Sequence, residues 1–280
     1  MALTAAAGVV TCPVCRNQLG LLDATGAPLA SAADGVASSA RCVNGHNFDV
    51  ARSGYLNLSG KATPQNADTA SMVQARARFL GSHAYDVVVE HVLTRVVGDL
   101  VVEAGAGPAY YLAHCVEAAP ERRGIAIDVS PAAARVAARA HPRIASLVAD
   151  IWDGLPLADG CVTTLLDLFA PRNLPEFARV LAPGGALVVV VPNPGHLAGL
   201  RRRFDLLRIH PDKVDDLIDR VPSELVLQET SQIGLSFQGS AEHVRDLIEM
   251  GPNAFHERKV KDAPEMIDID LSLLVWRKQG

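Results

Sequence analysis

Short runs of apolar, largely β-branched residues alternate with longer stretches of helical spacing through the chain after residue 98. The five apolar runs are residues 100–104, 124–128, 145–150, 162–169 and 186–191. The helical stretches between them are residues 111–119, 131–140 and 175–181. Buried strands that alternate with helices predict a parallel sheet with crossover helices. Two alternating segments, residues 225–236 and 266–276, bracket a predicted helix at 241–250 and would complete a mostly parallel, seven-stranded sheet.

The part of the chain before this pattern is organised differently. Residues 48–63 alternate apolar and polar positions and then meet Pro64, which predicts a short strand followed by a linker. Two helical stretches then begin near Thr69 and Tyr85 and lead into the sheet. We therefore expect a small N-terminal module, residues 1–62, and a larger α/β domain, residues 63–280.

Four candidate metal ligands stand in two close pairs within the N-terminal module. Cys12 and Cys15 form a Cys-x2-Cys pair, and Cys42 and His46 form a Cys-x3-His pair. Zinc binds thiolate and imidazole in a tetrahedron, and four protein ligands leave no position open for water. Unrelated thiols and a surface histidine are the alternative, but the paired spacing, with proline and glycine in the turns, favours one structural zinc ion per chain.

Length and composition narrow the class of protein. With 280 residues, 49% of them hydrophobic, the chain can build one substantial core and a small satellite. No apolar run approaches the roughly 18 residues of a membrane span, and the five cysteines do not form a disulfide framework. We therefore expect a cytoplasmic protein that does not enter a membrane. Residues 20–40, rich in Ala, Ser and Gly, are expected to form a projecting, disordered loop.

Charge is unevenly distributed along the chain. Of the net charge of −5, residues 1–80 contribute +2, from six Lys or Arg against four acids, and the rest contributes −7. A second basic cluster, Arg201 to Arg203 with Arg208 and Lys213, interrupts the acidic part. Charge clusters are usually solvated faces, so charge alone leaves nucleic-acid binding open.

A glycine-rich turn and a series of acids mark a candidate ligand site. The first strand of the α/β domain ends in the turn Glu103–Gly107, and the next three strands end at Asp128, Asp150 and Asp167. Ligands of doubly wound sheets bind beyond the carboxyl ends of the strands, so these acids should line one site. A turn of this kind can also serve NAD, and each acid can also be a helix cap. Four acids at four successive strand ends favour a ligand site.

Several segments in order make the chain resemble a known enzyme family. These are CPVC, CVNGHNFDVARSGYLNL, DTASMVQARARFL, VVEAGAG, IDVS, AARAHP, VADIWDGLPLADG, LFAPRNLPEFARVLAPGG and VPNPGHLAGL. The chain resembles, over almost its whole length, the 23S ribosomal RNA guanine-N1 methyltransferases of the RlmA type, which carry a zinc module ahead of a Rossmann-like class I methyltransferase domain. Members methylate guanine 745 or 748 in the loop of hairpin 35, and FAPRNLPE resembles the guanine 748 branch, which includes tylosin-resistance enzymes.

The resemblance implies S-adenosylmethionine as cofactor and assigns residues to it. Gly105 and Gly107 would wrap the methionine part together with Glu103, Asp128 would hold the ribose, and Asp150 with Ile151 would contact the adenine. The usual third glycine of the turn is Ala109 here, a departure that would widen the turn without blocking it.

Methylation of guanine N1 needs a base presented in line with the methyl–sulfur bond, and loss of the N1 proton. Asp167 is the first candidate for the base, and Phe169 for the wall against which guanine stacks. His196 is placed similarly, after the fifth strand. The alternatives are that Asp167 caps a turn and that Phe169 belongs to the core.

The resemblance also implies partners. The zinc module would read RNA through Arg41, Arg52, Tyr55, Asn57 and Lys61, and Arg76 with the arginines at 201–203 could extend the groove. The family expectation is a homodimer whose two modules form one cleft. Two other functions stay open: a methyltransferase of small molecules, and a non-catalytic zinc-ribbon protein that occupies ribosomal RNA.

Overall fold

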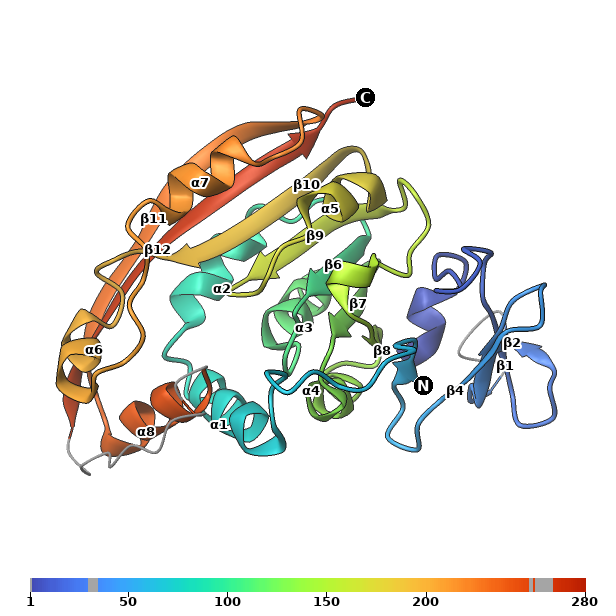
Figure 1. The fold of residues 1–280 in the computed structure, drawn as a ribbon, viewed down its shortest axis with the longest axis horizontal. Coiled ribbons are helices and arrows are strands. Elements are labelled where there is room, and N and C mark those ends of the chain that lie inside the picture. Colours follow the sequence, from blue (N-terminus) through green and yellow to red (C-terminus); the bar gives the residue numbers. More distant parts are fainter. Residues whose placement is uncertain (1, 30–34, 252–253, 255–263) are drawn as a thin grey trace.

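The protein is built around one large sheet that runs through its centre (Figure 1). The computed structural model describes residues 2–29, 35–251, 254 and 264–280. In these residues the large sheet has the strand order β11-β12-β10-β9-β6-β7-β8-β5. The strands are β5 (Leu56–Asn57), β6 (Leu100–Ala104), β7 (Arg123–Asp128), β8 (Ile144–Val148), β9 (Val162–Leu168), β10 (Leu181–Pro192), β11 (Leu225–Gly239) and β12 (Glu265–Lys278). Strands β5 to β10 are parallel to their neighbours, and β12 and β11 continue the sheet in antiparallel pairing.

Helices cover both faces of this sheet. They are α1 (Ala70–Gly81), α2 (Asp86–Leu93), α3 (Tyr110–Glu117), α4 (Pro131–Ala137), α5 (Leu174–Val180), α6 (Ala198–Phe204), α7 (Lys213–Asp219) and α8 (Ala241–Glu249), with the 3-10 helices η1 (Ala2–Ala6) and η3 (Ile151–Asp153). Buried residues of α1, α2, α3, α6 and α8 pack with one face of the sheet. Residues of α5, α7 and η1 pack with the other face, together with the N-terminal module. The arrangement confirms the predicted α/β class with a mostly parallel sheet.

The sheet has eight strands in the described part of the chain, so the predicted count of seven is corrected. The additional strand is β5, which comes from the end of the N-terminal module. Leu56 pairs with Leu147 and Asn57 with Val148 in parallel register, and the Leu58 N–H extends the pairing to the Val148 carbonyl at 2.9 Å. Burial explains the addition, because the side chains of Leu56 and Leu58 are 1% and 3% exposed.

The N-terminal module forms its own small antiparallel sheet of order β2-β1-β3-β4. Its strands are β1 (Gly20–Leu22), β2 (Pro28–Leu29), β3 (Ser39–Arg41) and β4 (Asn47–Asp49). Strands β1 and β2 and most of β3 lie in the segment 20–40, so the expectation of a disordered loop is wrong where these strands run. Buried Leu21, Leu29 and Ala40 hold these strands on the core. Residues 30–34 of the predicted loop lie outside the described residues.

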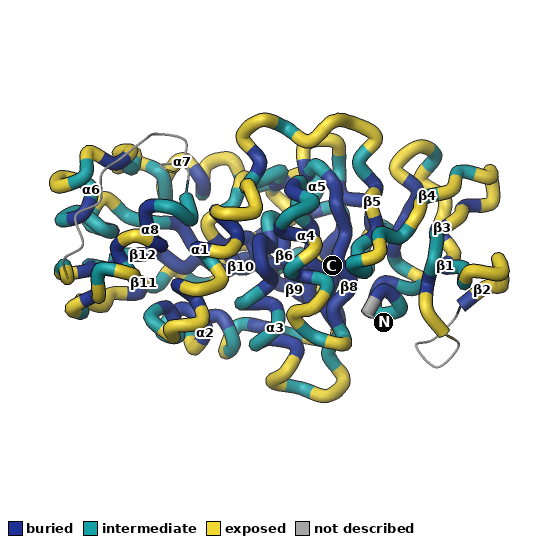
Figure 2. Tube along the Cα trace, turned by 90° about the horizontal axis from the view of Figure 1, so that it is seen from below, coloured by how far each residue is buried: buried dark blue, intermediate teal, exposed yellow. Residues whose placement is uncertain are grey.

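Burial is concentrated in the middle of the large sheet and falls off toward the loops (Figure 2). Strands β6 and β8 are buried throughout and β10 is buried from residue 185 to residue 191, as expected for strands covered by helices on both faces. The described helices include none of the length and apolarity that crossing a membrane requires.

Candidate active site

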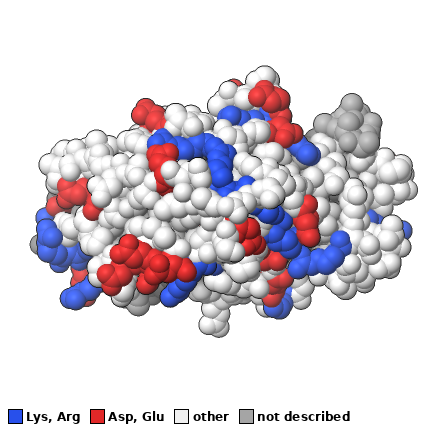
Figure 3. Space-filling model, turned by 90° about the horizontal axis from the view of Figure 1, so that it is seen from above, with Lys and Arg blue, Asp and Glu red and all other residues white. Residues whose placement is uncertain are grey.

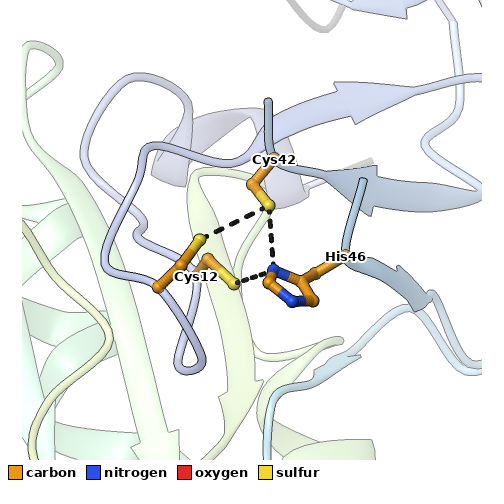
Figure 4. Close-up of side chains that lie close together, drawn as sticks. Cys12, Cys42 and His46 are labelled. Atoms are coloured by element: carbon orange, nitrogen blue, oxygen red, sulfur yellow. Dashed lines mark hydrogen bonds between the residues drawn. The ribbon is translucent and has the colours of Figure 1, made fainter. Parts of the chain in front are cut away.

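The four candidate metal ligands of the N-terminal module lie together. Figure 4 shows Cys12, Cys42 and His46 pointing toward one another. The donor atoms of these residues and of Cys15 all lie within 4.8 Å of one another. His46 Nδ1 is 3.6 Å from the Cys12 sulfur and 3.3 Å from the Cys42 sulfur, and the sulfurs of Cys15 and Cys42 are 3.6 Å apart.

The distances of 3.3–3.6 Å are close to those around a tetrahedral zinc ion. With Zn–S of about 2.3 Å and Zn–N of about 2.0 Å, tetrahedral ligand atoms lie roughly 3.5–3.8 Å apart. The four donors include three thiols and one imidazole, a set typical of structural zinc. Backbone hydrogen bonds shape both turns, since the Arg16 N–H donates to the Cys12 carbonyl and the Gly45 N–H to the Cys42 carbonyl. A backbone hydrogen bond from Asn17 also lowers the pKa of Cys15 to about 6, which favours the thiolate that zinc binds.

The metal-ligand group is joined to the large domain next to η3. The Thr11 N–H donates to the Pro156 carbonyl at 2.9 Å, and Arg16 donates to the Leu155 carbonyl at 3.2 Å. Lys61 forms an ion pair of 2.5 Å with Asp153 of η3. The module therefore lies beside the carboxyl end of β8, where Asp150 begins η3.

The glycine-rich turn after β6 is closely packed by two other segments. Gly105 and Gly107 both have left-handed backbone, with φ of +68° and +52°. A methyl group on Gly105 would lie 2.4 Å from Cβ of Ala170, and one on Gly107 would lie 3.0 Å from a guanidinium nitrogen of Arg76. Both glycines are favoured by their left-handed conformation, and Gly105 is also required by space, because its contact is with the short, rigid side chain of Ala170. The turn thus brings together the loop after β9 and a side chain of α1.

Asp128, at the end of β7, is bound to this turn. Its carboxylate accepts hydrogen bonds from the Gly107 N–H at 2.8 Å and from the Ser130 N–H at 2.9 Å. The side chain therefore stabilises both the glycine turn and the segment that leads into α4. Asp128 thus has the capping role that was the alternative, and it also lies in the candidate site. Burial raises the pKa of Asp128.

Glu103 lies at the centre of the candidate site on β6. Its side chain is 2% exposed and accepts a hydrogen bond from the Leu112 N–H of α3 at 3.2 Å. Burial raises the pKa of Glu103 to about 8, and the nearby charges of Asp128 and Asp167 act in the same direction. Burial removes the water that would otherwise bind the Glu103 carboxyl group. A polar group of a ligand bound at the glycine turn would replace that water.

Asp150 and Ile151 follow the end of β8, the strand that lies next to β7 with its Asp128. The Asp150 carboxylate accepts from the Trp152 N–H at 3.0 Å and caps η3. Ile151 is 8% exposed, whereas the neighbouring indole of Trp152 is 64% exposed. Asn173, from the loop after β9, donates to the Ile151 carbonyl at 2.8 Å. These contacts leave Asp150 at the rim of the same edge of the sheet as Asp128.

Phe169 lies at the centre of an aromatic cluster beside the glycine turn. Its ring centroid is 6.2 Å from that of Tyr85, 6.4 Å from that of Tyr111 and 6.5 Å from that of His196. The Phe169 ring is 39% exposed, whereas Tyr85, Tyr111 and His196 are buried. Phe169 therefore does not belong to the closed core, which was the alternative for this residue.

The backbone of Phe169 is left-handed, with φ of +62°. A bulky residue in this region is strained by about 1–2 kcal/mol. The conformation ends the alternation of β9 and turns the ring to the face that Tyr85 and Tyr111 occupy. Strain of this kind persists where surrounding contacts impose it, here the hydrogen bond from the Phe169 N–H to the Val190 carbonyl at 3.1 Å.

His196 supports this cluster as a neutral ring. Burial lowers its pKa to about 4. Its Nε2 lies 3.3 Å from the Tyr85 hydroxyl, and its Nδ1 accepts from the Asp270 N–H at 3.4 Å. Both ring nitrogens are therefore engaged with the protein.

Asp167 points to the opposite face of the sheet from the aromatic cluster. Asp167 lies inside β9, two residues after Leu165, so the two side chains are on the same face of the strand. Leu165 belongs to the core cluster of Val189, whereas Leu166, on the other face, belongs to the cluster of Tyr85. The carboxylate is fully buried and lies 3.1 Å from Nε of Arg172. Neither carboxylate oxygen has a well-directed hydrogen bond from the described residues. Burial raises the pKa of Asp167 to about 8.

The structure adds residues that sequence reasoning did not assign to this site. Tyr85 and Tyr111 complete the aromatic cluster, and Arg172 pairs with Asp167. Arg76, expected in an RNA groove, instead lies over the glycine turn, pairs with Asp68 and donates to the Met250 carbonyl. For Arg76, a signal was available in the sequence, because this arginine lies on the apolar face of the predicted helix.

The carboxyl edge of strands β6 to β9 with the loops that follow them, which we name the crevice, carries charges of two signs. Acids Glu103, Asp128 and Asp150 lie along the glycine turn and η3. On the other flank, the positive charges of Arg201 and Lys213 act on His196. Figure 3 shows one face of the molecule, on which basic and acidic groups are interspersed.

Known proteins resemble this chain over most of its length. The chain is 40% identical over 248 residues to the 23S rRNA (guanine(748)-N(1))-methyltransferase of Streptomyces fradiae, covering 83% of this chain and 88% of that protein. It is 41% identical over 264 residues to a candidate 23S rRNA (guanine-N(1)-)-methyltransferase of Micromonospora griseorubida, covering 88% of this chain and 86% of that protein.

Structural likeness agrees with these sequence relatives. A chain in the solved complex between the Haloferax volcanii Trm112 methyltransferase activator and a candidate methyltransferase matches with a TM-score of 0.51 and 21% identity, covering 76% of this chain and 99% of that one. This likeness concerns the fold. No protein-family model matches the sequence. On the identity and coverage of the two sequence relatives, the chain belongs to the family of 23S rRNA (guanine-N1)-methyltransferases.

Proposed function

We propose that this protein transfers a methyl group from S-adenosylmethionine to N1 of a guanine in 23S ribosomal RNA, with guanine 748 as the target that its Streptomyces relative's name indicates. The observation that carries the proposal is the contact between Gly105 and Ala170, which joins the glycine turn directly to the residue after Phe169. A cofactor on that turn and a base on that ring would be neighbours.

The cofactor would lie along the acidic flank of the crevice. S-adenosylmethionine supplies an electrophilic methyl group on a positively charged sulfur. The glycine turn, held by Asp128, provides close backbone approach for the methionine part together with Glu103. Asp128 would accept hydrogen bonds from the ribose hydroxyls, and Asp150 with Ile151 would lie beside the adenine. Acids along this flank also favour a cationic ligand.

Arg76 adds one cation to this flank. Its guanidinium lies against Gly107, and its positive charge acts on both Glu103 and Asp128. A planar guanidinium matches a carboxylate in paired geometry. We therefore assign Arg76 to the carboxylate of the methionine part.

The target guanine would stack on Phe169. This ring is exposed while the other three rings around it are buried, so it offers the accessible face of the cluster. Stacking of a flipped base on an aromatic ring contributes about 1–3 kcal/mol and is typical of enzymes that act on single-stranded RNA. Positioning of N1 toward the methyl group would supply most of the acceleration.

Asp167 is better placed to position Phe169 than to remove a proton. Its carboxylate is buried on the other face of the sheet and pairs with Arg172, five residues along the chain. The pair spans the loop that carries Phe169 and Ala170. We therefore replace the catalytic role that sequence suggested for Asp167 by a positioning role through Arg172.

The N-terminal module would bind RNA around the zinc ion. Cys12, Cys15, Cys42 and His46 would hold the ion, which fixes the two turns and does no chemistry on the substrate. Arg41, Arg52, Asn57 and Lys61 of the module are exposed. They offer contacts to phosphate, and Tyr55 is half-buried beside them. We keep residues 1–62 as the RNA-binding module although β5 belongs to the large sheet, and we propose a cytoplasmic homodimer.

The test is methyl transfer from labelled S-adenosylmethionine to protein-free 23S ribosomal RNA, with the modified position mapped by primer extension, which stops at N1-methylguanine. We expect a single stop in the hairpin 35 loop. The Phe169→Ala variant should reduce the rate at least tenfold while keeping cofactor affinity, and Phe169→Trp should restore part of it. Cofactor binding without RNA methylation would favour a small-molecule substrate, and no cofactor binding would refute the proposal.

A further inference from the structure

A cavity of about 480 Å³ opens beside α6, outside the cofactor cradle and the aromatic cluster. The residues that line it are Pro194, Ala198, Arg201, Arg202, Asp205, Leu206, Arg208 and Ile209. Three of the eight are arginines and one is an acid. The lining therefore carries a net charge of +2.

Two of these arginines lack the partners that neutralise other arginines of the protein. Arg78 pairs with Asp246 at 2.6 Å, Arg95 with Glu229 at 2.5 Å and Arg203 with Glu265 at 2.5 Å. Within the described ranges, neither Arg202 nor Arg208 has an ion pair or a side-chain hydrogen bond, and both are exposed. Two unpaired guanidinium groups at one concavity form a surface that attracts anions.

Arg201 is a third cation at the cavity, and its surroundings disfavour its positive charge. Its side chain donates to the Pro194 carbonyl, which fixes the guanidinium at the cavity wall. Burial and the adjacent charge of Arg202 lower the pKa of Arg201. Two like charges held together in this way repel each other, and an anion between them would relieve the repulsion.

The cavity is continuous along the chain with the site proposed for the base. The turn from Asn193 to Leu197 provides Pro194 to the cavity wall and His196 to the aromatic cluster around Phe169. The Leu197 N–H donates to the Asp268 carbonyl at 2.7 Å, and Asn193 donates to the Asp270 carboxylate at 2.8 Å, so the turn is anchored to β12. A ligand that occupies both places must have a flat aromatic part and a linked anion.

A nucleotide within RNA has this combination of groups. We propose that the cavity beside α6 binds a backbone phosphodiester of the RNA next to the target guanosine, through Arg201, Arg202 and Arg208. The inference rests on the proposed function, since it places the phosphate of the same substrate whose base stacks on Phe169. In this arrangement Asp128 and Asp150 would face the cationic cofactor, and the three arginines of the cavity would face the polyanionic RNA.

The experiment measures RNA affinity as a function of salt. A 23S hairpin 35 oligonucleotide is titrated with the full-length protein, and with the Arg202→Gln, Arg208→Gln and double variants, by fluorescence anisotropy at several salt concentrations. Loss of the phosphate contact in the double variant should lower the salt slope of the affinity by about 0.7, the value for one phosphate of a single strand, and each single variant should lower it by less. Affinity should fall roughly fivefold for each variant and more for the double variant.

Arg139→Gln is the matched control. Arg139 is exposed and follows the C-terminal end of α4, which lies at the amino edge of the parallel strands, opposite the crevice. Its loss should leave the Kd and the salt slope unchanged. Calorimetry with S-adenosylhomocysteine should give unchanged cofactor affinity for all four variants, which shows that their folds are intact.

The outcomes separate this inference from the proposed function. If the unmodified protein binds and methylates the RNA, and the double variant keeps its affinity and slope, the cavity does not bind phosphate and the inference is overturned. An equal loss with the Arg139 control would also overturn it, because the effect would then be general charge. If the unmodified protein neither binds nor methylates the RNA, the proposed function fails and the inference fails with it.

Discussion

The role of Arg76 gives the sharpest test of the cofactor site, because the cofactor exists in forms with and without the group that Arg76 would bind. S-adenosylhomocysteine carries the amino-acid carboxylate, and 5′-methylthioadenosine lacks the whole amino-acid part. The perturbation is Arg76→Ala. In the structure, the guanidinium lies against Gly107 with its side chain 25% exposed, so a carboxylate there would be largely shielded from water.

The magnitude follows from this burial. Hydrogen bonds to charged groups contribute about 1.5–3 kcal/mol, and about 1.4 kcal/mol corresponds to a tenfold change in affinity. We therefore expect Arg76→Ala to weaken S-adenosylhomocysteine binding roughly 10- to 100-fold in isothermal titration calorimetry. Binding of 5′-methylthioadenosine should change less than about twofold, because that ligand has no carboxylate to lose.

Asp68→Asn is the control for the ion pair that Arg76 forms within the protein. This change removes the charge partner of Arg76 but leaves the guanidinium in place. Affinity for S-adenosylhomocysteine should be kept or improved, since Arg76 no longer has a competing carboxylate. The reasoning would be refuted if Arg76→Ala weakened both ligands equally, because Arg76 would then act by shaping the glycine turn and not by binding the carboxylate.

Three further predictions concern other parts of the site. Gly105→Ala should lower the unfolding free energy by about 2–4 kcal/mol in chemical denaturation, because it combines a left-handed φ with a methyl 2.4 Å from Ala170; the control Gly184→Ala, also left-handed but with open space around it, should cost only about 1–2 kcal/mol, and equal losses would contradict the packing argument. Cys12→Ser should release zinc, measured by a chromophoric chelator, and lose RNA binding while calorimetry shows unchanged cofactor affinity; unimpaired RNA binding would show that the module does not read RNA. Burial raises the pKa of Glu103 from 4.5 to about 8, so the folded state holds a proton that the unfolded state releases between these pH values, and stability should fall as pH rises from about 5 to 8. Glu103→Gln should reduce that fall, by at most about 4–5 kcal/mol, and an unchanged pH profile would show that Glu103 is ionised in the fold.

The sequence determined the main strands and the metal-ligand group for a simple physical reason. Strands buried on both faces are continuous apolar runs, and the observed β6 and β7 agree with residues 100–104 and 124–128 to within one residue. The spacing of Cys12 and Cys15 fixes their separation through the local turn. Such features depend on neighbouring residues along the chain, so a local pattern is enough to find them.

Local pattern was not enough for α6 and α7. Both helices have seven residues, and the residues that flank α6, Leu197 and Asp205, have left-handed φ of +52° and +48°. These residue types give no capping signal, and the arginine run of α6 has the pattern of a solvated face. Helix α6 forms one wall of the cavity and is stabilised by contacts with β12. This strand lies about seventy residues further along the chain.

The convergence of the site was also decided by tertiary structure. The apolar run of β9 is buried on both faces, so its sequence cannot tell which face Asp167 takes, and the left-handed Phe169 then reverses the alternation that sequence reasoning assumes. Tyr85, Tyr111 and Phe169 come from a loop, a helix and a strand end whose side chains meet only after the sheet forms. The sequence by itself determined the fold class, the metal ligands and the positions of Asp128 and Asp150 at strand ends, because these follow from periodicity and spacing, whereas Asp167 lies inside β9 on the other face. Which side chains face one another across the crevice was decided by packing, because that depends on contacts between residues far apart in the chain.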